Sequence, residues 1–134
     1  MPDHPNIELA VRYHRADAAG ATGAALAAYF HPDVVQRELP NALVPQGATR
    51  NLDEILASAE RGQQVIRRQR FEFHHAVSTG DQVALEVTWI GVLAVPVGAL
   101  AAGSELRAEI ATFLTIRDGL IVEQRDYDCY VTKF

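Results

Sequence analysis

The spacing of the apolar residues changes once along this chain, near residue 68, and this change restricts the folds that the chain can adopt. Before it, apolar side chains recur every three or four residues, as on one face of a helix. After it, apolar and polar side chains alternate, as in strands with one buried face. Helices followed by strands predict an α+β fold, with the helices packed on one face of an antiparallel sheet. The chain has 134 residues and no linker, so we expect residues 1–134 to form one domain.

The first half of the sequence predicts three helices. The first covers residues 6–17, and the second begins at Thr22 and ends before Pro32, because a residue that precedes proline disfavours the helical conformation. Prolines and Gly47 indicate a loop over residues 40–50, and the third helix then starts at a capping box formed by Asn51 and Glu54.

Five strands are predicted, with tight turns at Gly80-Asp81 and Asp118-Gly119. They cover residues 33–39, 70–78, 82–93, 105–117 and 120–132. The stretch 87–104 carries no charge and reaches the minimum length of a membrane-spanning helix. Glycines and a proline interrupt it, so we interpret it as a strand and a loop and expect no membrane segment.

Charge and cysteine content exclude several classes of function. Twelve basic and 17 acidic side chains give a net charge of −5, and no basic stripe is present to bind nucleic acid. A single cysteine, Cys129, cannot form an internal disulfide, and residues 1–5 lack the basic and apolar start of a signal peptide. We therefore expect a cytoplasmic protein. The histidines show no ligand spacing and no nucleotide-binding motif is present, so no metal and no cofactor is predicted.

Counting outward from a two-residue turn at Asp118-Gly119 predicts the pairing across the last hairpin. The expected pairs are Phe113 with Gln124, Ala111 with Asp126, Glu109 with Asp128, and Arg107 with Tyr130. On this register Asp126 lies inside the strand end beside small and aromatic side chains. Burial there would raise its pKa and make it a general base, although a hydrogen-bonded structural aspartate remains the alternative. Glu109 and Asp128 would form an ion cluster with Arg107.

The same count predicts that a second face of this hairpin is apolar. It carries Leu106, Ala108, Ile110, Leu114 and Ile116 opposite Ile121, Tyr127, Cys129 and Val131. A face of this kind is either buried against other elements or used for association. We predict a homodimer through it.

Several stretches resemble the NTF2-like superfamily, and within it the SnoaL-like polyketide cyclases and the relatives of ketosteroid isomerase. Residues 80–91 are similar to the family strand that opens with Gly-Asp and closes on an aromatic residue and a glycine. Residues 118–127 resemble its last hairpin, and Tyr13 and Glu38 stand where the isomerase branch places its pocket tyrosine and acid. The resemblance implies a cone in which a strongly curved sheet wraps the helices around an apolar pocket, and a homodimer.

The resemblance also implies roles for the candidate residues. Asp126 matches the general base of the cyclase branch, Tyr13 an oxyanion donor, and Glu38, less closely, the isomerase base. The alternative for Tyr13 is a tyrosine whose ring packs inward and whose hydroxyl is exposed to solvent. The alternative for Glu38 is a solvated side chain. The isomerase branch has a second acid where this chain has Ala111 and Thr112, which departs from that pattern. The expected substrate-binding residues are Trp89, Ala111, Phe113, Gln124, Asp128 and Arg107.

Two functions follow from this interpretation. The first is a cofactor-independent acid/base enzyme, a cyclase, isomerase or hydrolase, acting on a small apolar polyketide-, terpenoid- or steroid-like molecule. The second is a non-catalytic module of the same fold that binds a ligand or mediates association.

Overall fold

Six strands form one sheet in the computed structural model, which describes residues 4–134, in the order β2-β1-β6-β5-β4-β3. The strands are β1 (Phe30–Glu38), β2 (Ala48–Arg50), β3 (Ile66–Thr79), β4 (Gln82–Leu93), β5 (Glu105–Arg117) and β6 (Leu120–Tyr130). The helices are α1 (Pro5–Ala18), α2 (Gly23–Ala27) and α3 (Leu52–Val65). Of the segment compared with a signal peptide, residues 1–3 lie outside the described residues.

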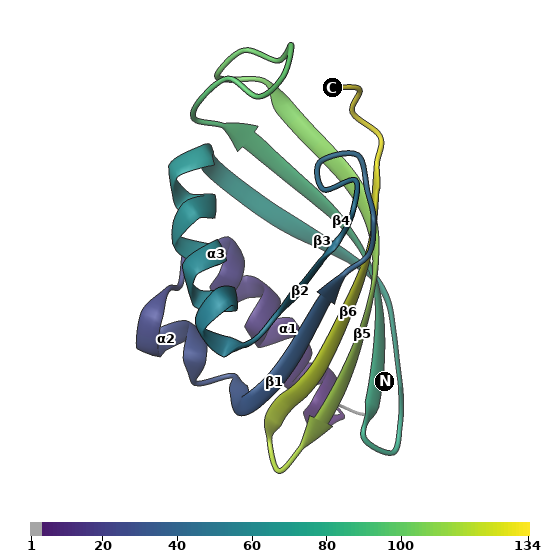
Figure 1. Ribbon diagram of the computed structural model, residues 1–134. Coiled ribbons are helices and arrows are strands. Elements are labelled where there is room, and N and C mark those ends of the chain that lie inside the picture. The colour runs from purple at the N-terminus through teal and green to yellow at the C-terminus, as the bar shows by residue number, and fades with distance from the viewer. Residues whose placement is uncertain (1–3) are drawn as a thin grey trace.

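The sheet is curved, and all three helices lie on one side of it (Figure 1). The predicted α+β cone is therefore confirmed. Apolar side chains of α1 and α3 pack against the inner face of the strands and form the main core. Its most completely buried side chains are Ala10, Val34, Val83, Val87, Leu114, Ile116 and Ile121, each at most 1% exposed. Among residues 4–134, the helices fall short of the length and apolarity that a membrane crossing requires.

Three details at the β1 edge differ from the expected antiparallel sheet. The strand β1 runs parallel to β6, and β2 lies within the segment predicted as a loop. The second helix ends at Ala27 and β1 already begins at Phe30, so Pro32 lies in a strand. A proline is tolerated there because the pairing with β6 is irregular between Phe30 and Val35, and β2 pairs only with Gln36 and the two residues after it.

A β-bulge in β6 overturns the predicted register of the last hairpin. Ile116 pairs with Ile121 and Thr115 with Glu123, so Val122 has no partner in β5. The extra residue shifts every later pair by one position. The observed pairs are Leu114 with Gln124, Thr112 with Asp126, Ile110 with Asp128 and Ala108 with Tyr130. The expected pairing of Phe113, Ala111, Glu109 and Arg107 with these residues is wrong, because those four side chains alternate onto the outer face of the sheet.

The bulge also divides the apolar surface that was predicted to form the dimer interface. Leu106, Leu114 and Ile121 are at most 1% exposed and face the interior. Tyr127 and Val131 are 45% and 58% exposed. The residues predicted to form one interface therefore do not share one surface, and this prediction is wrong. Some of them are buried in the interior, and the others are exposed on the outside of the sheet.

Candidate functional site

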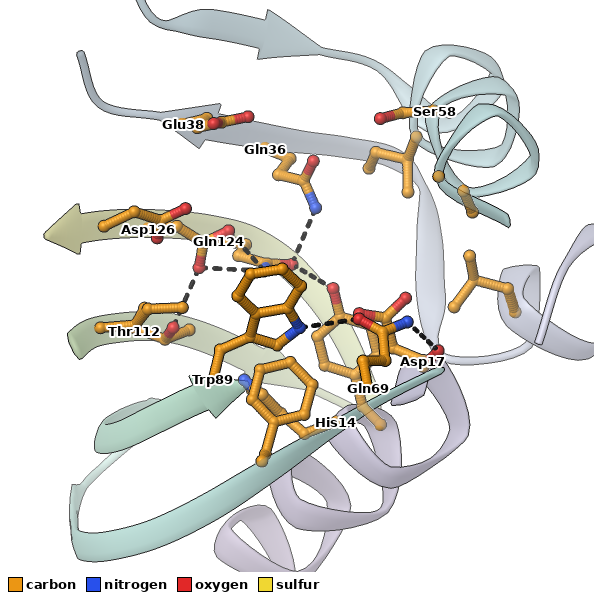
Figure 2. A pocket seen from close by; sticks show the side chains of 18 of the residues that line it. His14, Asp17, Gln36, Glu38, Ser58, Gln69, Trp89, Thr112, Gln124 and Asp126 are labelled. Atoms are coloured by element: carbon orange, nitrogen blue, oxygen red, sulfur yellow. Dashed lines mark hydrogen bonds between the residues drawn. The ribbon is translucent and has the colours of Figure 1, made fainter. Parts of the chain in front are cut away.

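A cavity of about 260 Å³ lies between the helices and the inner face of the sheet. Its apolar walls come from α2, α3, β3 and β5, and its polar side chains come chiefly from α1, β1 and β6. Four carboxyl groups line it, those of Asp17, Glu38, Asp126 and Asp128. Figure 2 shows Asp126, Gln124 and Thr112 together on the sheet, with Asp17 and Gln69 at the other side of the view.

Asp126 faces the cavity from β6, beyond the bulge. The Thr112 hydroxyl donates a hydrogen bond to its Oδ1 at 3.0 Å, and the Gln124 amide lies 3.1 and 3.0 Å from its two oxygens. Burial raises the pKa of Asp126 to about 6, with a smaller contribution from the charge of Glu38. The hydrogen bonds and the charge of Arg50 oppose this rise. The group therefore changes protonation close to neutral pH.

The Gln124 amide is oriented from the opposite side by two donors. The Tyr13 hydroxyl donates to its Oε1 at 2.9 Å, and the Gln36 amide donates to the same oxygen at 3.2 Å. These bonds fix which end of the Gln124 amide points to Asp126. Tyr13 is buried, and burial together with the charges of Asp17 and Asp126 raises its pKa well above the usual value. Its hydroxyl therefore stays protonated.

Glu38 forms an ion pair in the cavity wall. Arg50 Nη2 lies 3.0 Å from Glu38 Oε1, and Asn41 donates to Oε2 at 2.8 Å. The Glu38 side chain is only 16% exposed, so the interpretation as a solvated glutamate is wrong. The short strand β2 positions Arg50, which also donates to Gln36 Oε1 at 3.4 Å.

Asp128 and Tyr130 follow Asp126 on the same face of β6. Burial raises the pKa of Asp128 to about 7, and the charges of Asp126 and Glu38 add to this rise. Within residues 4–134, Asp128 Oδ1 is a buried atom with no hydrogen-bond partner. Burial and the neighbouring carboxylates also raise the pKa of Tyr130. The Tyr130 hydroxyl, and the Asp128 carboxyl group in its protonated form, can therefore donate a hydrogen bond to a ligand in the cavity at neutral pH.

The helix α1 contributes two titratable side chains that the sequence analysis did not identify. Burial and the charge of Asp126 raise the pKa of Asp17 to about 6. Burial lowers the pKa of His14 to about 4, and its Nδ1 lies 2.8 Å from the carbonyl oxygen of Ala10. The available signal was the spacing of Tyr13 and Asp17, which lie four residues apart and so share one helix face.

Trp89 lines the cavity, and Gln69 and Gly91 determine how its ring lies. Its Nε1 donates to Gln69 Oε1 at 2.7 Å, and Gln69 in turn donates to the backbone carbonyl of Asp17 at 3.4 Å. Gly91 lies beside the ring on the same strand, where a Cβ atom would stand 2.5 Å from Trp89 Cζ2. Only glycine at this position lets the ring lie flat along the strand.

Six of the nine residues predicted for the site line this cavity, and three do not. Those that line it are Asp126, Tyr13, Glu38, Trp89, Gln124 and Asp128. Ala111, Phe113 and Arg107 lie on the outer face of β5. The bulge at Val122 in β6 turns the residues with which they were expected to pair to the inner face. On the outer face, Phe113 stacks edge-on with Tyr127 at 5.7 Å, and Arg107 pairs with Glu109 at 3.5 Å.

Asp17, Gln36, Arg50 and Gln69 are among the polar lining residues that were not predicted from the sequence. Arg50 gave no signal because its segment was predicted as a loop. Within residues 4–134, no three side chains of His, Cys, Asp or Glu are grouped as a metal site would require.

Comparison with known proteins finds one matching family and several similar solved structures. Residues 10–124 match the family described as the SnoaL-like domain. IdmH, a candidate polyketide cyclase from Streptomyces antibioticus, superposes with a TM-score of 0.77 at 22% identity, covering 93% of this chain and 92% of its own. A candidate SnoaL-like polyketide cyclase from Jannaschia superposes with a TM-score of 0.73 at 17% sequence identity, and the match covers 92% of this chain and 85% of the Jannaschia chain.

A protein with a ketosteroid isomerase-like fold from Catenulispora acidiphila, solved in complex with trimethylamine, gives a TM-score of 0.68 at 22% identity, covering 90% of this chain and 84% of its own. No curated protein matches the sequence. At these identities the structural neighbours establish the fold.

Proposed function

Since the chain belongs to the family of SnoaL-like domains, we propose that its cavity binds a small organic molecule and that Asp126 removes a proton next to a carbonyl group of that molecule. One observation carries the proposal. Asp126 lines the cavity with a pKa of about 6, so at neutral pH it is mostly ionised and still basic enough to accept a proton.

The proposed step needs only groups that the chain supplies. The Asp126 carboxylate takes the proton from the carbon. The electron pair of the broken C–H bond forms a carbon–carbon double bond, and the π pair of the carbonyl group moves onto its oxygen. The resulting enolate needs hydrogen-bond donors in a poorly hydrated site. The Tyr130 hydroxyl and the protonated form of Asp128 are the donors that we assign to it, because both line the cavity. Tyr130 keeps its proton at neutral pH, and Asp128, with a pKa of about 7, holds its proton in part of the molecules.

Tyr13 has a different role in this proposal. Its hydroxyl already donates to Gln124, and so it orients the amide that holds Asp126. We therefore assign Tyr13 as a positioning residue, where the sequence analysis expected an oxyanion donor.

The enolate can complete two kinds of reaction. Returning the proton to another atom isomerises the molecule, and attack of the enolate on an electrophilic carbon of the same molecule closes a ring. The similarity to two candidate polyketide cyclases favours cyclisation of a polyketide-like substrate. The alternative is a non-catalytic binding module, and the hydrogen bonds that Asp126 accepts from Thr112 and Gln124 favour that alternative.

Proton exchange tests the proposal without knowledge of the natural substrate. The protein is incubated with 1-indanone in D₂O, and loss of the proton signal next to the carbonyl is followed by NMR. We expect exchange above the buffer rate, and we expect Asp126→Asn to abolish it. Asp33→Asn, which removes an exposed carboxylate from β1, is the matched control and should leave the rate unchanged. Exchange that persists in Asp126→Asn would exclude this residue as the base.

Tyr13→Phe separates positioning from direct stabilisation of the enolate. A positioning role predicts a loss of less than about tenfold in the exchange rate, since Gln36 still donates to Gln124. A loss of about a hundredfold or more would instead assign Tyr13 to the oxyanion.

We also propose that the chain forms a homodimer through the outer face of the sheet. Val77, Phe113 and Tyr127 are 65%, 37% and 45% exposed there. Val77 and Phe113 are both paired with Ala84 in β4, so they lie in one row across the sheet. Exposed aromatic and branched side chains in one patch are typical of an interface.

A further inference from the structure

The cavity carries more negative than positive charge. Its lining includes four carboxyl groups and one guanidinium, that of Arg50. Arg50 is paired with Glu38 at 3.0 Å. Among the lining residues, Asp17, Asp126 and Asp128 therefore have no cation of their own. Their charges repel one another, which is costly in a site from which water is largely removed.

Two of these three carboxyl groups also lack hydrogen-bond donors. Within residues 4–134, no side chain and no backbone N–H donates to the Asp17 carboxyl group, whose pKa is raised chiefly by burial. Asp128 Oδ1 is buried and has no partner in the same range. A buried carboxylate oxygen without a donor is uncommon in folded proteins and costs free energy. Asp126, by contrast, accepts from both Thr112 and Gln124.

Two aromatic side chains line the cavity together with the carboxyl groups of Asp17 and Asp128. Trp89 and Tyr130 line the cavity and meet edge-on with their centroids 6.4 Å apart. Trp89 is connected to the Asp17 backbone through Gln69. The faces of such rings attract cations, with tryptophan the strongest. The cavity thus offers acceptors, negative charge and aromatic faces, and among its lining residues the one cationic donor, Arg50, is already paired with Glu38.

We propose that the natural ligand of this cavity carries a protonated amine, which donates to the unpartnered Asp17 carboxylate while its apolar part packs against Trp89. This inference rests on the proposed function, since it names the ligand class of the same site. The amine binds at Asp17 on α1, and Asp126 on the sheet stays free to act on the carbonyl end. The sequence predicted a small apolar organic ligand, and this inference adds a protonated amine to its apolar body.

Binding of an amine to these carboxylates depends on pH. The carboxylates must be ionised to hold the cation, so affinity should rise as pH increases from about 5 to about 8 and binding should release protons. Seven other titratable or charged groups line the cavity together with Asp17: Tyr13 and His14 on α1, Glu38 on β1, Arg50 on β2, and Asp126, Asp128 and Tyr130 on β6. His14 stays neutral over this range, because burial lowers its pKa to about 4.

Three probes of one shape and different charge test the inference. Benzylammonium, benzyl alcohol and benzoate are each titrated into the protein, and affinities are measured by calorimetry or ligand-observed NMR. Near pH 8 we expect benzylammonium to bind about tenfold or more tightly than benzyl alcohol, and benzoate to bind most weakly. Asp17→Asn should remove the advantage of benzylammonium and leave the affinity for benzyl alcohol unchanged. Asp33→Asn removes one exposed charge and should change neither.

Equal affinity for the amine and the alcohol in the unmodified protein would overturn the inference, as would a preference for the amine that survives Asp17→Asn. The absence of benzylammonium binding up to about 10 mM would also overturn it. These failures are distinct from failure of the proposed function. Exchange of 1-indanone protons that depends on Asp126, without any preference for the amine, would contradict only the amine ligand.

Discussion

The carboxyl group of Asp126 accepts hydrogen bonds from Thr112 and Gln124, and burial still has the larger effect on its pKa. The resulting pKa of about 6 lies close to neutral pH, so both protonation states of Asp126 are accessible there. A carboxylate that is both oriented and basic is what removal of a proton from carbon requires. Tyr13 and Gln36 both donate to Gln124, which in turn orients Asp126. The chemistry proposed for one residue therefore depends on three elements of the fold, α1, β1 and β6.

The raised pKa of Asp126 predicts the sign of its effect on stability. A carboxyl group with a folded pKa of about 6 and an ordinary value of 3.8 contributes its stability fully at low pH, and that contribution is lost as pH rises through 6. Relative to the unmodified protein, Asp126→Asn should therefore become more stable between pH 4 and pH 7, by up to about 3 kcal/mol.

Urea denaturation at several pH values measures this difference. Any mismatch between the new amide and Gln124 adds an offset that does not change with pH, so only the trend is diagnostic. A variant that loses stability relative to the unmodified protein as pH rises would show that Asp126 is held mainly as an ionised structural group.

At the scale of elements, α3 and β6 determine the site most directly. The helix α3 places Ile55, Ser58 and Ala59 along one wall of the cavity. The bulge at Val122 lets Ile121 enter the core and still turns Gln124, Asp126 and Asp128 inward. A strand without this extra residue could not combine these orientations with the observed turn, because side chains alternate strictly along a regular strand.

The capping box of α3 gives a prediction at this scale. The Asn51 side chain accepts from the backbone N–H of Glu54 at 3.0 Å, and the Glu54 side chain accepts from the backbone N–H of Asn51 at 3.0 Å. Asn51→Ala removes the first bond and should lower the free energy of unfolding by about 1 kcal/mol. Chemical denaturation measures the effect, with Glu60→Ala on the exposed part of the same helix as control. Equal stability of the two variants would show that the cap contributes nothing.

At the scale of the whole molecule, the sheet separates two surfaces of different composition. Its inner face lines the cavity, and its outer face carries the exposed patch of Val77, Phe113 and Tyr127. Arg125 lies over the Phe113 ring at 5.5 Å and pairs with Glu123, so polar groups border the patch. An apolar centre with a polar rim is the usual composition of an interface between protein subunits.

The proposed dimer predicts opposite results for two residues of β5 that lie on opposite faces of the sheet. Phe113→Lys should leave the fold intact and shift the mass from dimer to monomer in light scattering at micromolar concentration, because the lysine would face another copy. Ile110→Lys should instead destabilise the fold by several kcal/mol, about 2 or more, because Ile110 faces the cavity. Val95→Lys, on the loop after β4, is the control for an exposed site outside the patch. A monomeric unmodified protein would contradict the proposal.

The sequence alone determined the order and type of most elements. Hydrophobic periodicity and the capping box located α1, α3 and the four long strands, since these signals depend on neighbours a few residues apart. The resemblance in residues 80–91 and 118–127 indicated the family that the match over residues 10–124 establishes. Tyr13, Glu38 and Asp126 were also named from the sequence, and all three line the cavity.

The tertiary structure alone decided which side chains meet. The bulge at Val122 turned Gln124, Asp126 and Asp128 to the inner face, whereas the residues expected to face them, Ala111, Phe113 and Arg107, lie on the outer face. No local pattern marks the bulge, because Val122 is an ordinary strand residue. Pairing of β2 with β1 brought Arg50 to Glu38, and helix packing brought Asp17 to the cavity. Contacts between residues so distant in sequence depend on the register of the whole sheet. Short-range periodicity determines each element, whereas the charge inside the cavity follows from the way the elements assemble.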